Sequence, residues 1–591
     1  MPSYKDIVLH IIRWQENHLK KRYFFLLLSI IVGLSGGISA LILKTSVFYL
    51  QNILLKGKSF DEYNLMIFLY PLIGITLTIL FNKYIIRDKV KHSIAVILNS
   101  ISRRNSLMKA HKIFSSIIGG ILTAGFGGSI GLESPIISSG ASIGSNTARI
   151  FKMNYKEVTL LLACGAAGAI SAIFHTPVAA IVFAIEVLLI DLTRFSLIPL
   201  LLASISGAII NVFFHDEILF EFTLRDPYEV SHTIFYILLG LICGLISVYF
   251  TRAFLKTDKL LSKYSEYKKL IIGGGILGIM IFLFPQLYGE GYKIIKMIFA
   301  GNFSDIIGTN YGINIAHNTL LFFLFFLILL FSKVIATSLT ISSGGIGGII
   351  APTLFTGAIT GMLFSHTLNI MGIDLFVSES NFALVGMSGL ISGVLHAPLT
   401  GIFLIAETTR GYELIVPIMI TSTISFVTVK YFEPNSIFTI QLAKRGKLIT
   451  HNKDKAALNF MNLKLLIEKD LKTIHVDATL GDLVKLISKS NRNIFPVIDN
   501  NEILIGIINL NDIREIMFNK DMYDTTFVIN LMNLPPTYIS INDSMNEVMK
   551  KFQETGAWNL PVISNAKYVG MISKSKLFSA YRNLLVELSE E

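Results

Sequence analysis

The chain has 591 residues, of which 52% are hydrophobic and 15% charged, with a formal net charge of +11 and a mean hydropathy of +0.62. This composition excludes a single soluble domain and indicates an integral membrane protein. The excess of Lys and Arg fits the ends of membrane segments, because no basic stripe with interleaved aromatic residues indicates a nucleic-acid partner. The two cysteines, Cys164 and Cys243, both lie in apolar sequence, so we expect neither a disulfide framework nor a metal site.

A polar arm precedes the apolar part of the chain. Residues 1–23 predict a cytoplasmic helix, because Lys20, Lys21 and Arg22 come directly before the first apolar run. That run is too long for a cleavable signal peptide. Over 24–440 we expect a helical domain in the plasma or inner membrane, in contact with lipid, with apolar runs at 24–50, 66–82, 194–214, 233–251, 270–285 and 319–332. Two further segments, 117–131 and 345–363, are interrupted by Gly or Pro, which membranes tolerate only where protein or a cavity surrounds the break.

The membrane part contains an internal repeat, in which a block recurs about 220 residues later. The repeat divides the domain into halves of about 24–215 and 233–440, and such repeats are typical of transport proteins with a site between the halves. The matched pairs are Gly131/Gly348, Pro135/Pro352, Gly140/Gly357, Gly144/Gly361, Gly165/Gly386, Gly168/Gly389, Ser171/Ser392, His175/His396, Pro177/Pro398 and Glu186/Glu407.

Each half contains a glycine-rich approach to a predicted helix start, at Gly131–Pro135 and at Gly348–Pro352. A helix N-terminus inside a membrane favours an anion through its free N–H groups and its dipole. If the halves fold with inverted topology, both N-termini aim at the bilayer centre. Glu133 then has two open roles: a displaceable gate in the anion position, or an ordinary first-turn acid that offsets its own helix dipole. Burial in a membrane repeat favours the gate.

Other repeated residues are better explained by a structural role than by a functional one. His175 and His396 each precede an X-Pro step, which indicates one turn used twice. The symmetry of Glu186 and Glu407 indicates helix-end roles, although Glu186 is also a candidate proton donor. Lys333 lies in an apolar run, where it either snorkels to an interface or adds positive potential, and the sequence does not decide between these.

The character of the chain changes after a predicted linker at 441–462. Two similar segments follow, 463–520 and 526–585, each with an amphipathic helix, a short strand, a polar turn and a second strand. They resemble a tandem pair of CBS domains, a soluble α/β regulatory module. CBS pairs often bind adenine nucleotides through an Asp that follows the second strand. Asn509 and Asp512 hold those places in the first copy, whereas Ser573 and Lys576 hold them in the second. The alternative is a scaffold without a ligand.

The membrane motifs G-L-E-S-P (131–135) and G-I-I-A-P (348–352), followed by H-A-P-L-T-G-I-F-L-I-A-E (396–407), resemble the signatures of CLC chloride channels and chloride/proton antiporters. The resemblance covers about residues 20–445. It implies a membrane all-α fold with a CLC-type inverted repeat, about eighteen helices of which many do not span fully, and the soluble α/β CBS pair. It also implies a homodimer in which each subunit has its own anion pathway.

The same resemblance implies the site. Glu133 matches the gating glutamate, and the residues that match the family's anion site are His92, Ser93, Gly131, Leu132, Glu133, Ser134, Gly348, Ile349, Ile350 and Phe438. Three of them depart from the family pattern: His92 stands for a serine, Ile350 for a phenylalanine, and Phe438 for the tyrosine that contacts the anion. The inner proton glutamate of the antiporters falls at Val187, directly after Glu186.

These observations predict chloride transport by a CLC-type protein that is not an enzyme. A gated chloride channel is favoured, because Val187 cannot carry a proton. The alternative is a chloride/proton antiporter in which Glu133 and Glu186 are the proton relay candidates and the inner route is non-standard. A CBS-regulated cation transporter is less favoured, because the apolar segments contain few acids. No nucleophile–base pair or metal cluster indicates an enzyme that acts on lipid.

Overall fold

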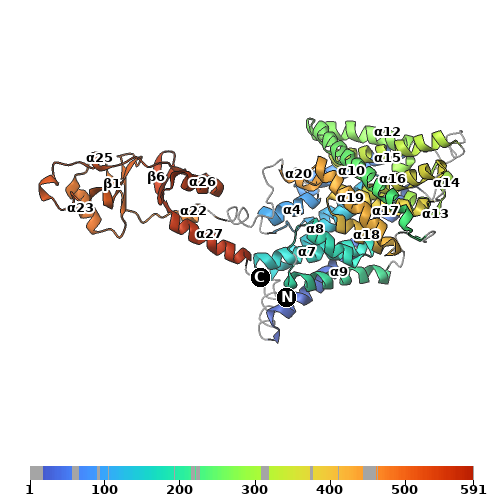
Figure 1. Ribbon diagram of the computed structural model, residues 1–591, viewed down its shortest axis with the longest axis horizontal. Coiled ribbons are helices and arrows are strands. Elements are labelled where there is room, and N and C mark those ends of the chain that lie inside the picture. The colour runs from blue at the N-terminus through green and yellow to red at the C-terminus, as the bar shows by residue number, and fades with distance from the viewer. Residues whose placement is uncertain are drawn as a thin grey trace. The chain divides into compact units, whose positions relative to one another are not determined.

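The computed structural model describes residues 18–55, 66–88, 93–103, 106–191, 193–214, 220, 222, 227–307, 318–372, 377–409, 412–443, 461 and 463–589. Most of the predicted N-terminal helix, and the predicted linker apart from its start and Met461, lie outside these residues. The chain forms two compact units, Met1–Leu448 and Ile449–Glu591 (Figure 1).

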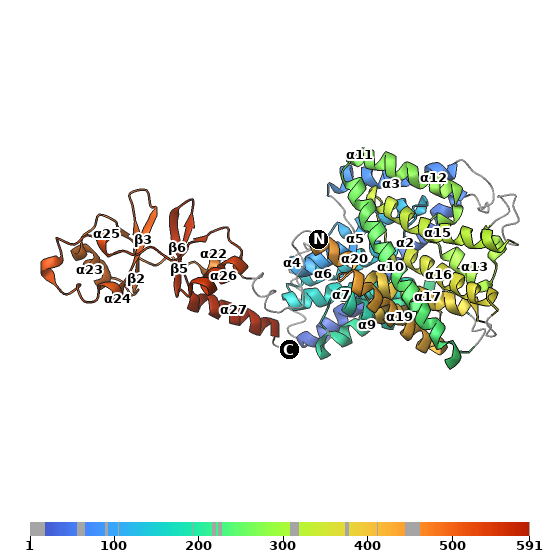
Figure 2. The ribbon, with the colours of Figure 1, turned by 45° about the horizontal axis from the view of Figure 1, so that its top comes forward.

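The regular elements among the described residues of the first unit are all helices, and those of its first half pack around α7 (Figure 2). The elements of this half are α2 (Lys21–Leu55), α3 (Met66–Leu80), the π-helix η1 (Phe81–Ile86), α4 (Ser93–Arg103), α5 (Lys112–Gly125), α6 (Glu133–Ile150), α7 (Tyr155–Phe174), α8 (Pro177–Glu186) and α9 (Arg194–Phe214).

The second half repeats this order from α15 onward, so that α16, α17, α18 and α19 correspond to α6, α7, α8 and α9. Its elements are η2 (Val230–His232), α10 (Thr233–Ser262), α11 (Glu266–Lys269), η3 (Leu270–Gly274), α12 (Gly275–Leu283), η4 (Pro285–Leu287), α13 (Tyr292–Ala300), α14 (Phe303–Ile307), α15 (Thr319–Ser342), α16 (Ile350–Ile370), α17 (Glu379–Leu395), α18 (Pro398–Thr409), η6 (Tyr412–Leu414), α19 (Ile415–Phe432) and α20 (Ile437–Ala443).

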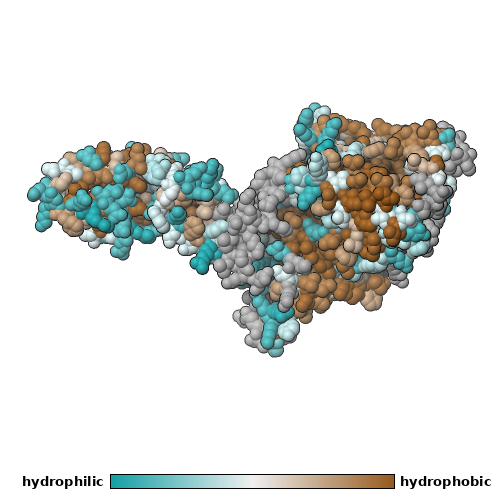
Figure 3. All heavy atoms as spheres, viewed as in Figure 1, coloured by the Kyte–Doolittle hydropathy of each residue, from teal (hydrophilic) through white to brown (hydrophobic). Residues whose placement is uncertain are grey.

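Seven helical segments among the described residues are long and apolar enough to cross a membrane. Apolar side chains such as Leu27, Ile31, Ile205 and Met419 are exposed on them, and Figure 3 shows large hydrophobic areas on this unit. The helix α7 is the innermost of the seven, with 94% of its apolar window buried. A surface that is apolar over helices of this length fits lipid as its solvent.

In both halves, neighbouring helices cross at glycines that match in the repeat. A Cβ atom on Gly140 or Gly165 would overlap the backbone of the other, so α6 and α7 touch backbone to backbone. The same contact joins α16 and α17, where a Cβ on Gly357 would lie 2.6 Å from the Gly386 carbonyl oxygen. The predicted histidine turns are also confirmed, since His175 and His396 both end their helices in the left-handed conformation at φ 57°. The repeated residues therefore maintain one architecture twice.

The crossing of α6 and α7 gives the first prediction. Gly165→Ala places a methyl group against the backbone of α6, and overpacking of this kind costs about 1–3 kcal/mol of unfolding free energy. Gly275→Ala is the matched control, because a Cβ there meets nothing within 4 Å. Thermal unfolding of the detergent-solubilised protein should show a lower midpoint for Gly165→Ala alone. Equal midpoints for the two variants would contradict the backbone contact.

The second unit contains two three-stranded sheets of identical design. In each, a short strand pairs in parallel with the middle strand, which pairs antiparallel with the third. The elements are α22 (Leu463–Leu466), β1 (Ile474–His475), α23 (Leu480–Ser488), β2 (Ile494–Ile498), β3 (Leu504–Asn509), α24 (Leu510–Ile513), η7 (Lys520–Met522), α25 (Val528–Leu531), β4 (Ile539–Ser540), α26 (Met545–Thr555), β5 (Asn559–Ser564), β6 (Lys567–Ser573) and α27 (Lys574–Ser589). Each sheet has its own hydrophobic core, which confirms the predicted repeat.

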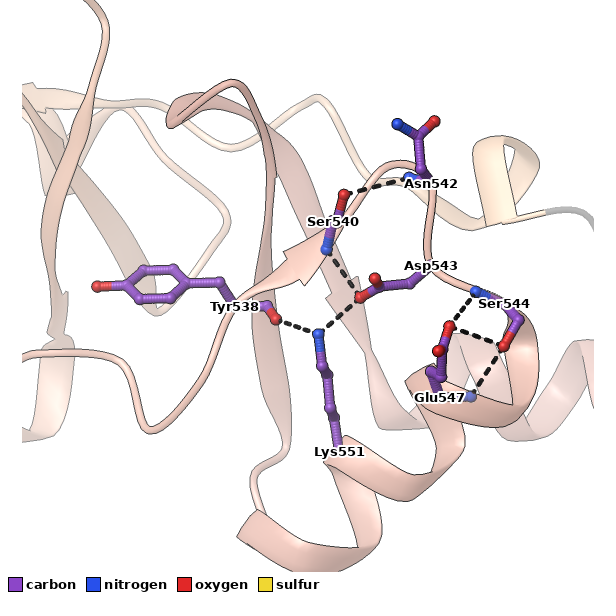
Figure 4. Close-up of polar contacts among 7 residues, drawn as sticks. All are labelled: Tyr538, Ser540, Asn542, Asp543, Ser544, Glu547 and Lys551. Carbon is purple, nitrogen blue, oxygen red and sulfur yellow. Dashed lines mark hydrogen bonds and ion pairs between the residues drawn. The ribbon is translucent and has the colours of Figure 1, made fainter.

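Polar contacts fix the entry to α26 in the second sheet (Figure 4). Ser544 caps the helix and forms a capping box with Glu547, whose carboxylate accepts from the Ser544 N–H at 2.8 Å. These hydrogen bonds stabilise the ionised carboxylate and lower the pKa of Glu547. Lys551 reaches back from α26 to bond Asp543 at 2.6 Å and the Tyr538 carbonyl oxygen at 2.8 Å. The helix is therefore tied to the strand β4 that precedes it.

Candidate anion-binding site

The two interrupted segments of the membrane unit meet at a pair of backbone hydrogen bonds. The Gly131 N–H donates to the Gly348 carbonyl at 2.9 Å, and the Gly348 N–H donates to the Gly131 carbonyl at 2.7 Å. The breaks predicted in the sequence are present, since the chain leaves the helical conformation at 126–132 and again at 343–349. Because α6 begins at Glu133 and α16 at Ile350, the N-termini of two helices lie close together here.

A threonine from each half supports the loop of the other half. The Thr123 hydroxyl accepts from the Ile346 N–H at 3.1 Å, and the Thr340 hydroxyl accepts from the Ser129 N–H at 3.3 Å. Both threonines lie near the ends of helices, α5 and α15, that lead into the two loops. The N–H groups of Ser129 and Ile346 thus find their acceptors across the repeat.

The Glu133 side chain fills the space between the two helix starts. Its residue is fully buried, and a Cβ atom on Gly348 would lie 2.9 Å from its Oε2. The backbone N–H groups of Glu133 itself and of Ala351 act favourably on this carboxylate, so it receives dipoles from both halves. The Oε2 atom is buried and has no hydrogen-bond partner within the described part of the chain. An acid that only offset its own helix would not reach the opposite helix start, so this position favours the gate.

Tyr292 supplies the hydrogen bond that the sequence did not predict. Its hydroxyl donates to Glu133 Oε1 at 2.7 Å from the start of α13. Glu290, two residues earlier, acts electrostatically on the same glutamate. The only signal in the sequence is the pattern Tyr288-Gly-Glu-Gly-Tyr292, in which glycines flank an acid after an apolar run.

The remaining predicted residues fall into three groups. Leu132, Ser134, Ile349 and Ile350 are all buried at the two helix starts. Phe438 is buried on α20, which packs against α4, so it lies near the segment that begins at Ser93. The side chain of Ser93 and the whole of His92 lie outside the described residues.

Lys333 does not snorkel, which excludes one of the two interpretations left open by the sequence. The side chain is fully buried on α15, and its ammonium donates to the carbonyl oxygens of Leu287 at 3.3 Å and Gly289 at 2.8 Å. The ammonium also lies 5.0 Å from the centre of the Phe355 ring. The amine of Lys333 is therefore held inside the protein, beside the turn that carries Glu290.

Glu186 and Glu407 form reciprocal caps between the halves. The Glu186 carboxylate accepts from the N–H groups of Leu399 at 3.1 Å and Thr400 at 2.7 Å, at the start of α18. Glu407 on α18 accepts from the N–H groups of Val178 and Ala179, at 3.1 and 2.8 Å, at the start of α8. The predicted helix-end roles are confirmed, although each glutamate caps a helix of the other half.

The position that carries the inner acid in the family's antiporters is apolar and buried. Val187 follows α8 directly, is 6% exposed, and donates its N–H to the Phe183 carbonyl. Both oxygens of the neighbouring Glu186 are already bonded to α18, with the Thr400 hydroxyl as a third donor at 2.8 Å. This segment therefore offers no free carboxylate.

In the second unit, Asp512 is partnered on both sides. Its Oδ2 accepts from the side-chain amides of Asn509 at 3.1 Å and Asn533 at 3.0 Å. In the second repeat the Ser573 hydroxyl instead donates to Glu468, which also pairs with Arg492. The two predicted nucleotide residues thus lie together, and the two repeats differ in chemistry at this place.

The caps between the halves give the second prediction. Glu186→Ala leaves two N–H groups of α18 without an acceptor, and the loss of a helix cap costs about 0.5–2 kcal/mol of unfolding free energy. Glu186→Gln keeps one acceptor oxygen and should cost less. Glu413→Ala, which removes an exposed acid of η6, is the control in thermal unfolding. A Glu186→Ala protein that unfolds like wild type but loses proton movement would support the relay role instead.

Comparison with known proteins agrees with this geometry. The sequence matches the family described as "Voltage gated chloride channel" over residues 73–430, and the CBS domain over 464–519 and 528–583. It is 30% identical over 353 residues, 58% of this chain and 70% of the relative, to proteins named H(+)/Cl(-) exchange transporter ClcA from Salmonella paratyphi B and Salmonella newport.

Solved structures share the fold. A slow cyanobacterial Cl-/H+ antiporter superposes with a TM-score of 0.62 and 22% identity, covering 72% of this chain and 98% of that one. A eukaryotic CLC transporter superposes with a TM-score of 0.60 and 16% identity, covering 94% of this chain and 99% of that one. These superpositions show that the chain shares its fold with these two proteins. The chain belongs to the voltage gated chloride channel (CLC) family and carries a C-terminal pair of CBS domains.

Proposed function

We propose that this membrane protein exchanges chloride for protons, with Glu133 as both gate and proton carrier. The observation that carries the proposal is the fully buried Glu133 carboxylate, which occupies the meeting point of two helix N-termini. An ionised carboxylate there competes with a chloride ion for the same N–H groups. A protonated carboxyl group competes poorly, because the dipoles favour negative charge. Chloride entry and protonation of Glu133 are therefore linked.

Exchange is preferred here to the channel that Val187 favours in the sequence. The relatives that are 30% identical are named as H(+)/Cl(-) exchange transporters, and they match 58% of this chain. The Glu133 carboxylate has no exposed surface, which supports a site that carboxylate and chloride occupy in turn over an open pore. Since Val187 carries no proton and Glu186 is bonded to α18, the inner half of the proton path runs through water in this proposal.

The third prediction tests this function in liposomes. An imposed chloride gradient should drive protons uphill through the wild-type protein. Glu133→Gln should abolish uphill proton movement and keep chloride flux, because the amide still accepts from the Tyr292 hydroxyl but carries no exchangeable charge. Glu379→Gln changes an acid at the start of α17 and serves as the matched control. Chloride flux through wild type without any uphill proton movement would establish the channel instead.

We also propose that the CBS pair binds at most one adenine nucleotide per chain, at Asp512. The two amides that now bond Asp512 would have to give way to a ribose, so binding should be weak.

The fourth prediction is that titration of the 455–591 fragment with ATP, ADP and AMP shows at most one site. Asp512→Asn should weaken that site at least about tenfold through the loss of a charged acceptor, whereas the exposed Asp524→Asn should not. No binding of any nucleotide would leave the scaffold interpretation.

The assembly and orientation are part of the proposal. The resemblance implies a homodimer, and α9 and α19 expose apolar side chains such as Ile209 and Val416 that suit either lipid or a second copy. Lys20, Lys21 and Arg22 at the start of α2 favour a cytoplasmic N-terminus, and hence a cytoplasmic CBS pair. Light scattering in detergent measures the mass, and protease protection in oriented vesicles locates the CBS pair.

A further inference from the structure

The turn that carries Glu290 is locked against both helix starts of the anion site. The Gly289 N–H donates to the Gly127 carbonyl at 3.3 Å, in the loop that precedes Glu133. A Cβ on Gly291, which has φ +93°, would lie 2.6 Å from the Phe355 ring on α16. The Lys333 ammonium bonds the Gly289 carbonyl at 2.8 Å from the other side. Glu290 therefore has a fixed place relative to Glu133.

Glu290 faces a defined set of charged and titratable groups. Glu133 acts on it from α6, Lys44 from α2 and Lys333 from α15, and the Leu132 backbone N–H interacts favourably with its carboxylate. Tyr292 interacts electrostatically with both Glu133 and Glu290 while its hydroxyl bonds Glu133. Tyr292 thus bonds one carboxylate and interacts electrostatically with the other, and both lysines interact favourably with Glu290.

The two acids differ in their access to solvent. Glu133 is fully buried, whereas part of Glu290 reaches the surface of the described structure. Each presents one buried carboxylate oxygen without a hydrogen-bond partner among the described residues, Oε2 of Glu133 and Oε1 of Glu290. A buried acceptor without a donor is costly for an ionised acid and is satisfied when a proton resides there. A proton shared between Glu133 and Glu290 would therefore satisfy a buried oxygen of one acid or the other.

We propose that Glu290 is a second proton-carrying carboxylate of the gate, through which protons pass between the solvent and Glu133. In this step the carboxylic acid of Glu290 gives its proton to the Glu133 carboxylate, through the Tyr292 hydroxyl or a water molecule. Glu290 is left ionised beside Lys333 and Lys44 until solvent returns a proton. The expected proton flux through Glu290 rests on the proposed exchange. The expected effect of Glu290 on the pH dependence of chloride flux does not rest on it.

The geometry also assigns Tyr292 a positioning role. Its hydroxyl is the only side-chain donor to Glu133 in the described structure, and its ring packs edge-on against Phe220 at 5.6 Å. Because α13 begins at Tyr292, the ring is fixed by the same turn that fixes Glu290. Loss of the hydroxyl removes the link between the two acids without removing either of them.

The fifth prediction uses Glu290→Gln in the full-length protein in liposomes. Chloride-driven proton flux should fall about tenfold or more, as expected for loss of a positioned proton-transfer group. Chloride flux should persist, and its activation by acid should move to lower pH, because the gate loses a neighbouring negative charge. Glu290→Asp should restore part of the proton flux. Asp305→Asn, an exposed acid of α14, is the matched control and should behave as wild type.

The readouts separate this inference from the proposed exchange. Wild-type protein that moves no protons uphill would refute exchange, and the shifted pH profile of Glu290→Gln would still support the coupled acids. Wild-type proton flux and an unchanged pH profile in Glu290→Gln would overturn the inference and leave exchange intact. If Glu290→Gln does not fold, Tyr292→Phe replaces it, because loss of the linking hydroxyl should slow proton flux more than chloride flux. Equal rates of both in Tyr292→Phe and wild type would then overturn the inference.

Discussion

The membrane unit depends on the reciprocal hydrogen bonds between Gly131 and Gly348. Two helical segments of the membrane unit are interrupted. Each interruption leaves backbone N–H and C=O groups without helical partners, and lipid cannot satisfy them. Pairing the two breaks satisfies some of these groups, while Thr123 and Thr340 satisfy others across the repeat. The N–H groups of Glu133 and Ala351, one from each helix start, act on the same carboxylate. Their meeting point attracts negative charge because of how the breaks are paired.

Charge at the centre is balanced by groups from several elements. Glu133 comes from α6, Tyr292 from α13 and Lys333 from α15, and no two of them are neighbours in the sequence. A buried charge is tolerated when its partners are fixed by packing, and here the 285–292 turn fixes them. The lysine contacts carbonyl oxygens and an aromatic ring, so its charge acts on the acids at a distance. The surroundings of Glu133 are thus a property of the tertiary structure.

The sequence predicts the repeat, the two breaks and Glu133, because spaced glycines and prolines report backbone geometry directly. It does not predict Tyr292 or Glu290, because no periodic pattern marks the turn that carries them. The partner of Tyr292, Glu133, lies 159 residues away in the sequence. The caps by Glu186 and Glu407 are predicted as helix-end roles, but capping rules are local and cannot indicate a helix in the other half. Val187 pointed to a channel because one position was read alone, whereas the relatives over 353 residues are named as exchangers.

The crossed caps of Glu186 and Glu407 bear on how such a protein can arise. Each half contains a helix start, at α8 or α18, whose N–H groups donate to a carboxylate of the other half. A single half alone would therefore lack two hydrogen-bonding partners. The N–H groups at its helix start would lack an acceptor, and its carboxylate would lack N–H donors. Two copies of one ancestral half would complete each other without any new contact. Association of identical segments is then a sufficient starting point, and fusion of the genes only makes that association permanent.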